Sequence, residues 1–250
     1  DHNGKATVPA DVQQKSIIHC AAGAYHTCCI DDVYIVHCWG WDGNGQVSDA
    51  PKDVGFFQLA LGEYTSCGLV RDDEDPAVNS TASCWGDDID NQISDIPAGT
   101  RFVKLAGDGY EGDAFCGLDF ASRVHCWGSN KNGRVSGAPA LSPTAAPTTA
   151  SPSAPTTASP SASPITASPT LPTVSPSARP SASPSRPVTF MDVGVGREHV
   201  CGIVEAPESG AMVCWGLDGD GQGTSGVPEN IAFTRVAAGG WHTCALDGIS

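Results

Sequence analysis

The sequence predicts an all-β protein, a disulfide-stapled β-propeller that is interrupted by a polyproline-II-like spacer. Three observations lead to this prediction: a Cys-Trp-Gly triplet recurs four times, a second cysteine precedes each triplet, and one internal segment is rich in Pro, Ser and Thr. Without that segment the repeat period is about 40 to 46 residues. Short runs of Val, Ile, Phe and Trp between Gly-, Asn- and Asp-rich turns favour four antiparallel strands per repeat, which is one propeller blade.

Each repeat has the same order of features. A polar turn such as WDGNGQVSDAP or GDDIDNQISDIP follows the triplet, and an apolar strand such as FFQLALG or RFVKLAGD follows the turn. We expect the tryptophan of each triplet to pack against a neighbouring blade, because a buried indole supplies a large apolar surface. These tryptophans are Trp39, Trp85, Trp127 and Trp215.

The repeats divide the chain into three regions. Residues 1–140 contain a half repeat and three whole repeats, 141–187 form the spacer, and 188–250 contain one whole repeat and a half repeat. The total is four whole repeats plus two half repeats. Because both ends fall within a repeat, we expect a fragment of a longer chain. A five-blade ring closed by pairing the two ends and a segment of a longer array both remain open.

The spacer has a composition that does not form a folded core. Residues 141–187 hold 12 of the 19 prolines, with 12 serines, eight threonines and no aromatic residue. Such a segment cannot bury enough apolar surface to offset its conformational entropy. Dense proline favours an extended polyproline-II conformation with a rise of about 3.1 Å per residue. The spacer is expected either to loop out of one ring or to join two separate propeller pieces.

Both glycosylation and proline hydroxylation are predicted. Ser/Thr-rich segments with Pro are typical of O-glycosylated stalks, with an unmodified flexible linker as the alternative. The repeated Ser-Pro units also resemble the hydroxyproline-rich glycoproteins of algal and plant walls, which implies hydroxylated and glycosylated prolines. Asn79-Ser80-Thr81 is an N-glycosylation sequon in a polar insertion. The predicted sites are Asn79, Ser151, Pro152, Ser159, Pro160, Ser163, Pro164, Ser168, Pro169, Ser175, Pro176, Ser183 and Pro184.

Eleven cysteines are too many for an ordinary cytosolic domain of this length, and their placement follows the repeat. Alignment of the strands pairs each triplet cysteine with the cysteine that precedes it. A further pair lies symmetrically about the turn at Ala24-Tyr25, and the partner of Cys244 would lie in the next strand. Zinc is the alternative, but the spacing follows the strands rather than C-x₂-C pairs. The predicted bridges are Cys28–Cys38, Cys67–Cys84, Cys116–Cys126, Cys201–Cys214 and Cys20–Cys29.

The strings AAGAYHTCCIDDVYIVHCWGWDGNGQ and VAAGGWHTCALDG resemble the repeats of the regulator-of-chromosome-condensation family. The resemblance covers nearly all of 1–140 and 188–250, and it implies a β-propeller, usually of seven blades in that family. It implies less about activity, because the family includes a guanine-nucleotide exchange factor on chromatin, plant ultraviolet photoreceptors and secreted enzyme inhibitors. The segment 240–243, GWHT, lacks the Arg of the photoreceptor motif, and the disulfides and acidity are unlike a nuclear exchange factor.

Charge and motifs exclude several functions. The formal net charge of −15 repels a phosphate backbone, so nucleic acid is not expected as a partner. No apolar run approaches the roughly 20 residues that a membrane-spanning helix needs. No serine lies in a nucleophile elbow, no Ser-His-Asp arrangement is evident, and no phosphate-binding glycine loop follows a strand. The sequence therefore predicts a non-enzymatic protein with no catalytic residue and no cofactor.

Three histidines occupy the same position in the repeat. His26, His199 and His242 each precede a repeat cysteine by two residues, whereas the equivalent positions elsewhere hold Thr65 and Ala114. Because Thr and Ala cannot perform acid–base chemistry, a structural role is predicted for these histidines.

One loop comes close to a calcium-binding pattern. Asp218, Asp220 and Gln222 place oxygen atoms at alternating positions, as Ca²⁺ requires, and Glu229 follows six residues after Gly223. However, Gln222 stands where the pattern requires Asp or Asn, and the equivalent segments of other repeats are typical of turns. An ordinary turn is the favoured interpretation, with calcium as the alternative.

Together these features predict a secreted structural glycoprotein of an extracellular matrix, cell wall or surface filament. Its expected partners are other copies of itself or other matrix glycoproteins, joined through unpaired strand edges, and covalent glycans. The alternative is a secreted propeller binding module that recognises a carbohydrate or a protein, with the spacer as its stalk.

Overall fold

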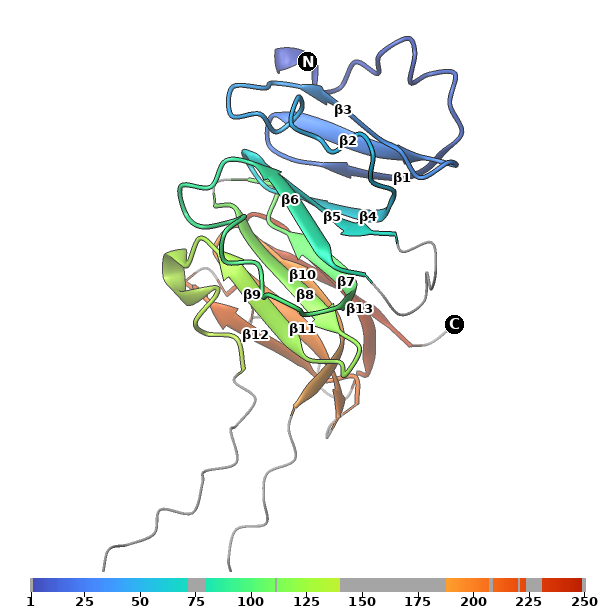
Figure 1. Ribbon diagram of the computed structural model, residues 1–250. Coiled ribbons are helices and arrows are strands. Elements are labelled where there is room, and N and C mark those ends of the chain that lie inside the picture. The colour runs from blue at the N-terminus through green and yellow to red at the C-terminus, as the bar shows by residue number, and fades with distance from the viewer. Residues whose placement is uncertain are drawn as a thin grey trace, which may run out of the picture. The chain divides into compact units, whose positions relative to one another are not determined.

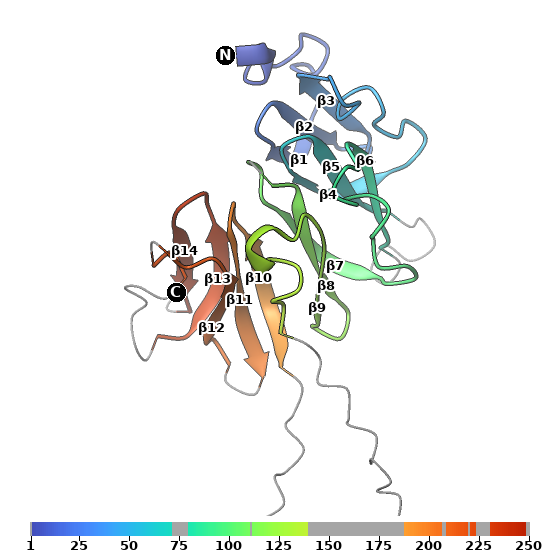
Figure 2. The same cartoon turned by 90° about the vertical axis from the view of Figure 1, so that its left-hand side faces the viewer.

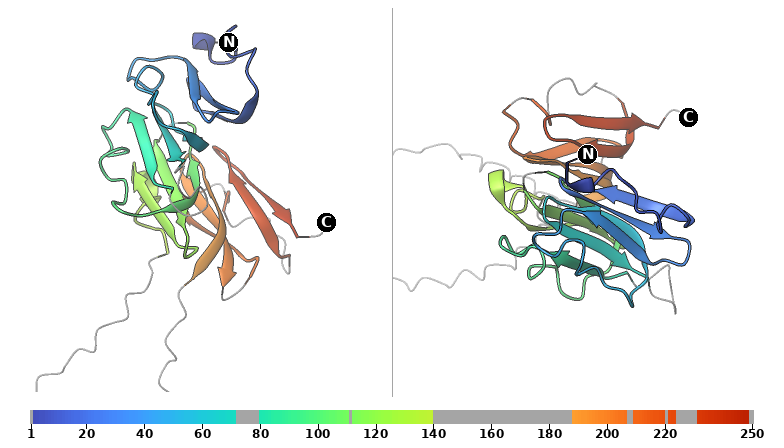
Figure 3. Two further views of the ribbon diagram at one scale, coloured as in Figure 1. Left: turned by 45° about the vertical axis from the view of Figure 1, so that its right-hand side comes forward. Right: turned by 90° about the horizontal axis from the view of Figure 1, so that it is seen from above.

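The computed structural model describes residues 2–71, 80–110, 112–139, 188–206, 209–219, 221–223 and 231–248. Fourteen strands in these residues form five small antiparallel sheets that follow one another in chain order (Figure 1, Figure 3). Two short 3₁₀ turns, η1 (His2–Gly4) and η2 (Lys131–Gly133), are also present. The strands are β1 (Ile17–Ala22), β2 (His26–Asp31), β3 (Val36–Gly40), β4 (Phe56–Leu61), β5 (Thr65–Val70), β6 (Ala82–Gly86), β7 (Phe102–Gly107), β8 (Ala114–Asp119), β9 (Val124–Gly128), β10 (Thr189–Val195), β11 (His199–Ala206), β12 (Met212–Gly216), β13 (Phe233–Ala238) and β14 (Thr243–Asp247).

Each sheet is one blade, and the blades are numbered I to V along the chain. Blades I to IV pair as β1-β2-β3, β4-β5-β6, β7-β8-β9 and β10-β11-β12, and blade V contains β13-β14. Residues 1–141 and 187–250 form one compact unit. Blade III lies beside blade IV (Figure 2), and the Phe190 amide donates to the Ser122 carbonyl across this junction (2.7 Å). The strands before and after the spacer therefore belong to neighbouring blades.

The sequence predicted four strands per blade, whereas blades I to IV of the described residues have three. The polar segment after each Cys-Trp-Gly triplet folds into hydrogen-bonded turns instead of a fourth strand. In blade I the Asp42 carboxylate accepts hydrogen bonds from the amides of Val47 and Ser48 (2.8 and 2.9 Å). Asp88 and Asn130 accept equivalent bonds in blades II and III. Asp and Asn side chains that bond to nearby amides compete with strand formation, which explains the difference.

Five disulfides staple the blades, and they join the pairs that the repeat alignment predicts. In each of blades I to IV one bridge joins two cysteines that lie directly opposite each other on the second and third strands. A fifth bridge joins β1 to β2 in blade I. Cys244 on β14 is exposed and forms no disulfide. The bridges are Cys20–Cys29, Cys28–Cys38, Cys67–Cys84, Cys116–Cys126 and Cys201–Cys214.

The triplet tryptophans connect each blade to the turn that precedes it. Their indole N–H groups donate to backbone carbonyls of equivalent turn positions one repeat earlier, a hydrogen bond in addition to the packing that the sequence predicts. Trp85 and Trp127 are almost fully buried in these contacts. The four bonds are Trp39 to Lys5 (2.9 Å), Trp85 to Gln46 (3.0 Å), Trp127 to Gln92 (3.1 Å) and Trp215 to Arg134 (2.9 Å).

The hydrophobic core lies between the blades. At the junction of blades I and II, Ile30 packs in one cluster with Phe56 and Trp85. At the junction of blades III and IV, Leu118 packs with Phe190. A three-stranded sheet has two faces to cover, so a blade buries its apolar residues only against its neighbours.

Polar side chains near the start of the first strands connect successive blades. These strands lie side by side, β1 beside β4, β4 beside β7, β7 beside β10 and β10 beside β13. Each side chain bonds to the first strand of the following blade, and at three of the four junctions the partner is a backbone group. The contacts are His19 Nε2 to Leu59 O (3.3 Å), Gln58 to the backbone of Leu105 (both 3.0 Å), an ion pair of Lys104 with Asp192, and Asp192 Oδ2 accepting from the Val236 amide (2.8 Å).

We predict that Trp85→Phe destabilises the protein by about 1–3 kcal/mol, because the smaller ring leaves space in a buried junction and the Gln46 carbonyl keeps only its bond from the Ser66 hydroxyl (3.3 Å). Denaturant unfolding of the disulfide-intact chain measures this change. Trp241→Phe is the matched control, since its indole is 52% exposed, and it should alter stability by less than about 0.5 kcal/mol. Equal losses in the two variants would contradict the junction role of Trp85.

Candidate functional site

The turns between the first and second strands lie next to one another at one end of the five sheets. The Gly109 amide of blade III donates to the Leu61 carbonyl of blade II (3.0 Å). Gly23 lies so close to the Gly62 carbonyl that an added Cβ would be 2.3 Å away, and the same holds for Gly196 and the carbonyl of blade V's turn. We call this surface the turn face. It comprises residues 23–25, 62–64, 108–110, 112–113, 196–198 and 239–242.

The residues that directly follow the third strands belong to the same surface. Each donates its backbone amide to a carbonyl of the turn in its own blade, so the two segments are held together at the same end of the sheet. The bonds run from Trp41 to Tyr25 (3.0 Å), Asp87 to Tyr64 (3.0 Å), Ser129 to Asp113 (3.2 Å) and Leu217 to Glu198 (2.8 Å).

Aromatic residues are concentrated on the turn face. Three of the four tyrosines of the chain lie there, together with both tryptophans that are outside the Cys-Trp-Gly triplets. None of these five side chains is fully buried, and Tyr110 and Trp241 are 48% and 52% exposed. Tyr and Trp at a solvent-accessible surface are typical of binding sites. The five residues are Tyr25, Trp41, Tyr64, Tyr110 and Trp241.

One aromatic cluster spans blades I and II. The rings of Tyr25 and Tyr64 stack with centroids 5.5 Å apart, and Trp41 contacts both rings edge-on at 6.1 and 5.3 Å. A hydrogen bond from the Tyr64 phenol to the Glu63 carboxylate, with smaller contributions from burial and from Tyr25, raises the pKa of Tyr64 above its ordinary value. The phenol therefore stays protonated, and the cluster presents neutral rings beside a carboxylate.

A second cluster spans blades III to V. The Arg197 guanidinium lies between two exposed rings, 4.4 Å from the centroid of Trp241 and 5.8 Å from that of Tyr110. Cation–π contacts of this kind hold an arginine side chain in place at an exposed surface. The turn face thus carries ordered aromatic groups on both halves.

Two larger cavities, of about 390 and 820 Å³, open elsewhere on the described residues, and a smaller one lies directly on the turn face. This turn-face cavity has a volume of about 290 Å³ and lies between the turns of blades II and III. Its wall contains four carboxylates and one lysine. The charged and aromatic lining residues are Glu63, Tyr64, Asp87, Asp90, Asp113 and Lys131.

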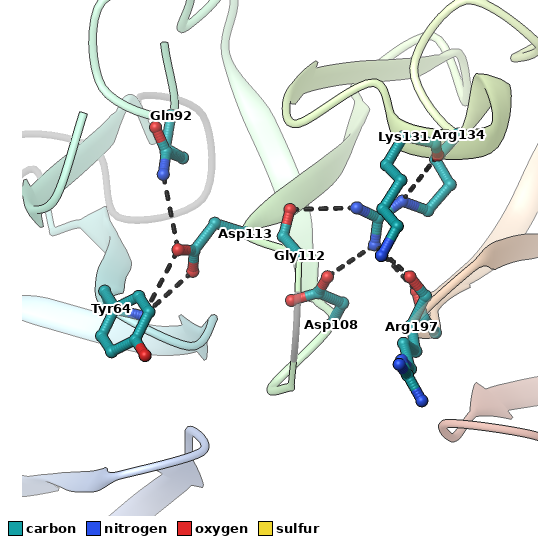
Figure 4. Close-up of polar contacts among 9 residues, drawn as sticks. Tyr64, Gln92, Asp108, Gly112, Asp113, Lys131, Arg134 and Arg197 are labelled. Carbon is teal, nitrogen blue, oxygen red and sulfur yellow. Dashed lines mark hydrogen bonds and ion pairs between the residues drawn. The ribbon is translucent and has the colours of Figure 1, made fainter. Parts of the chain in front are cut away.

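Asp113 forms the inner wall of the turn-face cavity and is 5% exposed. Its carboxylate accepts hydrogen bonds from the Tyr64 amide (3.1 Å) and from Gln92 Nε2 (3.4 Å), as Figure 4 shows. Burial raises the pKa of Asp113 to about 6, the hydrogen bonds from Tyr64, Gln92 and the Glu63 backbone oppose that change, and the negative charge of Glu63 adds to it. The cavity therefore holds a buried carboxyl group whose negative charge is poorly compensated.

A buried ion pair ties the turns of blades III and IV beside the cavity. Arg134 donates to the Asp108 carboxylate (2.6 Å) and to the carbonyls of Gly112 (3.0 Å) and Arg197 (2.6 Å), as Figure 4 shows. Burial raises the pKa of Asp108 to about 7, whereas the guanidinium of Arg134 lowers it. Because both side chains are fully buried, this pair holds the two turns in a fixed relation.

Two of the repeat histidines connect neighbouring blades. His26 Nε2 lies 2.8 Å from the Ser66 hydroxyl, and His199 Nε2 lies 2.7 Å from the Thr243 hydroxyl. Both histidines are buried beneath the turn face. His242 is exposed.

The remaining predicted sites fall largely outside the described residues. Asn79, all spacer positions, Asp220 and Glu229 lie there. Asp218 accepts a hydrogen bond from the Gly223 amide (2.7 Å), as in a turn, and Gln222 is buried. Among the described residues, no group of three or more His, Cys, Asp or Glu side chains is placed to hold a metal ion. In the same ranges, no helix has the length and apolarity to cross a membrane.

The turn face was not predicted from the sequence, although the sequence contains a signal for it. Tyr25, Tyr64 and Trp241 each precede a repeat cysteine by three residues, and Asp113 and Glu198 take this position in the other blades. This position varies between the repeats and is aromatic or acidic in all five blades.

Comparisons with known proteins show the fold. No protein-family model and no curated protein matches the chain. The ectodomain of the receptor kinase CR4 from Physcomitrella patens is 21% identical with a TM-score of 0.60, over 99% of this chain and 52% of that one. The CRINKLY WD40 ectodomain of the receptor kinase ACR4 from Arabidopsis thaliana is 23% identical with a TM-score of 0.54, over 96% and 63%. Prp20p from Saccharomyces cerevisiae, the yeast RCC1, is 17% identical with a TM-score of 0.56, over 96% and 56%.

The fold is thus that of a β-propeller, and its turn face is rich in aromatic residues. The predicted resemblance to the repeats of the regulator-of-chromosome-condensation family is confirmed at the level of the fold, which is similar to that of the yeast RCC1. The chain spans about half to two thirds of the length of the solved structures that it matches.

We predict that the free energy of unfolding falls as the pH is lowered from about 6.5 to 4, because of His26. Burial lowers its pKa from 6.5 to about 4, and Asp42 opposes this change. In that pH range the unfolded chain binds more protons than the folded chain, so acid destabilises the fold by about 3 kcal/mol at pH 4 relative to pH 7. Denaturant unfolding at several pH values should show this component in the natural chain and not in His26→Gln. Identical pH profiles for the two proteins would contradict it.

Proposed function

We propose that this protein is an extracellular binding module that recognises a protein partner through the turn face. The concentration of accessible Tyr and Trp side chains on that face carries the proposal. Large aromatic side chains bury much apolar surface at little cost in conformational entropy, and they dominate the energetics of protein interfaces.

The distribution of the other aromatic side chains supports a special role for this surface. Four of the seven phenylalanines, Phe56, Phe102, Phe115 and Phe190, are fully buried in the junctions between blades. The triplet tryptophans also lie in these junctions. Packing of the fold accounts for those rings, whereas it does not require Trp41 or Trp241 to lie at the surface.

The scaffold beneath the turn face is stiff. Disulfides cross-link the second strands to the third strands in blades I to IV, close to the turns. The buried Arg134–Asp108 pair adds a link between two turns. Rigid elements that hold side chains in position lower the entropic cost of binding, so such a surface suits recognition.

The disulfides support an extracellular location for this protein. Disulfides persist in oxidising environments such as the extracellular space and are rare in the cytosol. CR4 and ACR4 supply similar folds as ectodomains of receptor kinases. Both observations support an extracellular location for this chain.

A structural role in a matrix, cell wall or filament is a second candidate, and the composition of 141–187 favours it. A segment dense in Ser-Pro units would carry sugars and act as a stiff, coated spacer. In that case other copies of the chain or other matrix glycoproteins would be its partners.

We predict that the turn face binds peptides selected from a random dodecapeptide phage library. Trp41→Ala and Trp241→Ala should each reduce recovery of the selected phage at least tenfold, because each substitution removes an aromatic contact. Phe120→Ala is the matched control: this ring is 47% exposed but follows β8, at the opposite end of the blade. Failure to select any binder, or equal losses in all three variants, would contradict the proposed function.

We also predict that residues 141–187 of native material carry hydroxyproline or sugars on Ser and Thr. Glycopeptide mass spectrometry without reduction of the disulfides measures this directly. A bare peptide with unmodified masses would exclude the matrix-glycoprotein candidate and leave the binding module intact.

A further inference from the structure

The turn-face cavity has the size of a site for one side chain. Its volume of about 290 Å³ lies at the lower end of the range for ligand pockets, which starts near 300 Å³ for drug-sized molecules. Glu63 and Tyr64 contribute one wall from the turn between β4 and β5. Asp113 contributes the opposite wall from the turn before β8, and Asp87 and Asp90 lie at the end of β6. Two neighbouring blades therefore share the cavity.

The carboxylates of this cavity have no cationic partner among the described residues. Asp113 is bonded to a backbone amide and a neutral side-chain amide, and Asp87 receives a bond from the same Gln92 (3.4 Å). Glu63 accepts from the Tyr64 phenol. Four carboxylates against Lys131 leave a formal excess of negative charge in the cavity.

Four other buried carboxylates of the described residues are compensated differently. They pair with basic side chains, as expected for charges removed from water. The pairs are Asp31 with Lys15 and His37, Asp108 with Arg134, Asp119 with Arg123 and His125, and Asp192 with Lys104. Glu198, at the repeat position of Asp113, is also buried and forms none of these ion pairs. What distinguishes Asp113 is that it lines a cavity with three further carboxylates, where a cation from outside the chain would compensate the charge.

Resting on the proposed function, we infer that the turn-face cavity receives an arginine or lysine side chain of the partner protein. The cation enters between Glu63, Asp87 and Asp113, and its stem or guanidinium plane lies against the Tyr64 ring. Apolar residues that flank it in the partner pack on Tyr25 and Trp41.

The chemistry of the cavity disfavours other ligands. A metal ion needs several well-placed ligands, and the described residues contain no such group. A phosphate, sulfate or acidic peptide would meet like charge both in the cavity and from the net charge of −15. A guanidinium or ammonium group matches the carboxylates by charge and gains a cation–π contact with Tyr64.

The test uses peptides selected from the dodecapeptide library on the full, disulfide-intact chain. Each selected peptide is synthesised with a fluorescent label, and its affinity is measured by fluorescence anisotropy. The selected peptides should share an Arg or Lys next to apolar residues. Replacing that Arg by citrulline, or that Lys by norleucine, removes the charge with little change of shape and should weaken binding at least tenfold.

Substitutions in the protein test whether the cavity carboxylates recognise the positive charge of the peptide. Glu63→Gln and Asp87→Asn should each weaken the charged peptide about tenfold and reduce the difference between charged and neutral peptides. Asp90→Asn, at an exposed position on the rim, should act in the same direction with an intact fold. Asp32→Asn is the control, because it makes the same charge change at an exposed position in the β2–β3 turn, at the opposite end of blade I, and it should change affinity less than twofold.

The outcomes separate this inference from the proposed function. If Trp41→Ala weakens binding while citrulline peptides bind as well as arginine peptides, the turn face is a binding site but the cavity does not recognise a cation. If Asp32→Asn weakens binding as much as Asp87→Asn, only general charge attraction is present and the inference is overturned. If the tryptophan variants have no effect, the proposed function itself fails.

Discussion

The structure depends on the contact between each Cys-Trp-Gly indole and the turn of the preceding repeat. A three-stranded sheet cannot bury both of its faces, so no blade is stable without its neighbours. A triplet tryptophan solves this at the junctions of blades I to IV with one side chain, because its ring fills the apolar space and its N–H satisfies a buried carbonyl. Trp85 on Gln46 and Trp127 on Gln92 are the most deeply buried examples.

This arrangement leaves side chains at equivalent positions free to vary. The bond to the tryptophan uses only the backbone carbonyl, so the residue that supplies it can be Lys, Gln or Arg. At the blade III turn the chain uses that freedom: the Arg134 side chain reaches Asp108 and the carbonyl of Arg197 and joins two turns. The same logic applies to the turn face, where backbone bonds hold Tyr64 and Asp113 in place and their side chains take up different roles.

Local constraints explain why the sequence predicted most of the fold. Strand periodicity, the cysteine pairing and the junction tryptophans all repeat with one period, and paired cysteines lie on adjacent strands of one hairpin, as Cys67 and Cys84 do. The number of strands per blade was wrong, because Asp42 and its equivalents bond to nearby amides and form turns in place of a fourth strand. A pattern of apolar residues does not show whether such a polar segment forms a turn or a strand.

The sequence by itself determined the all-β class, the repeat, the cysteine pairs and the composition of the spacer, since each rests on residues close together in the chain or on composition alone. Only the tertiary structure decided which side chains meet at the turn face. Tyr25 and Tyr64 lie one repeat apart, and they stack because successive blades place equivalent turns side by side. Asp113 and Glu63 come together for the same reason. A binding surface built from one position per repeat exists only after the blades have packed, because no blade contains enough of it alone.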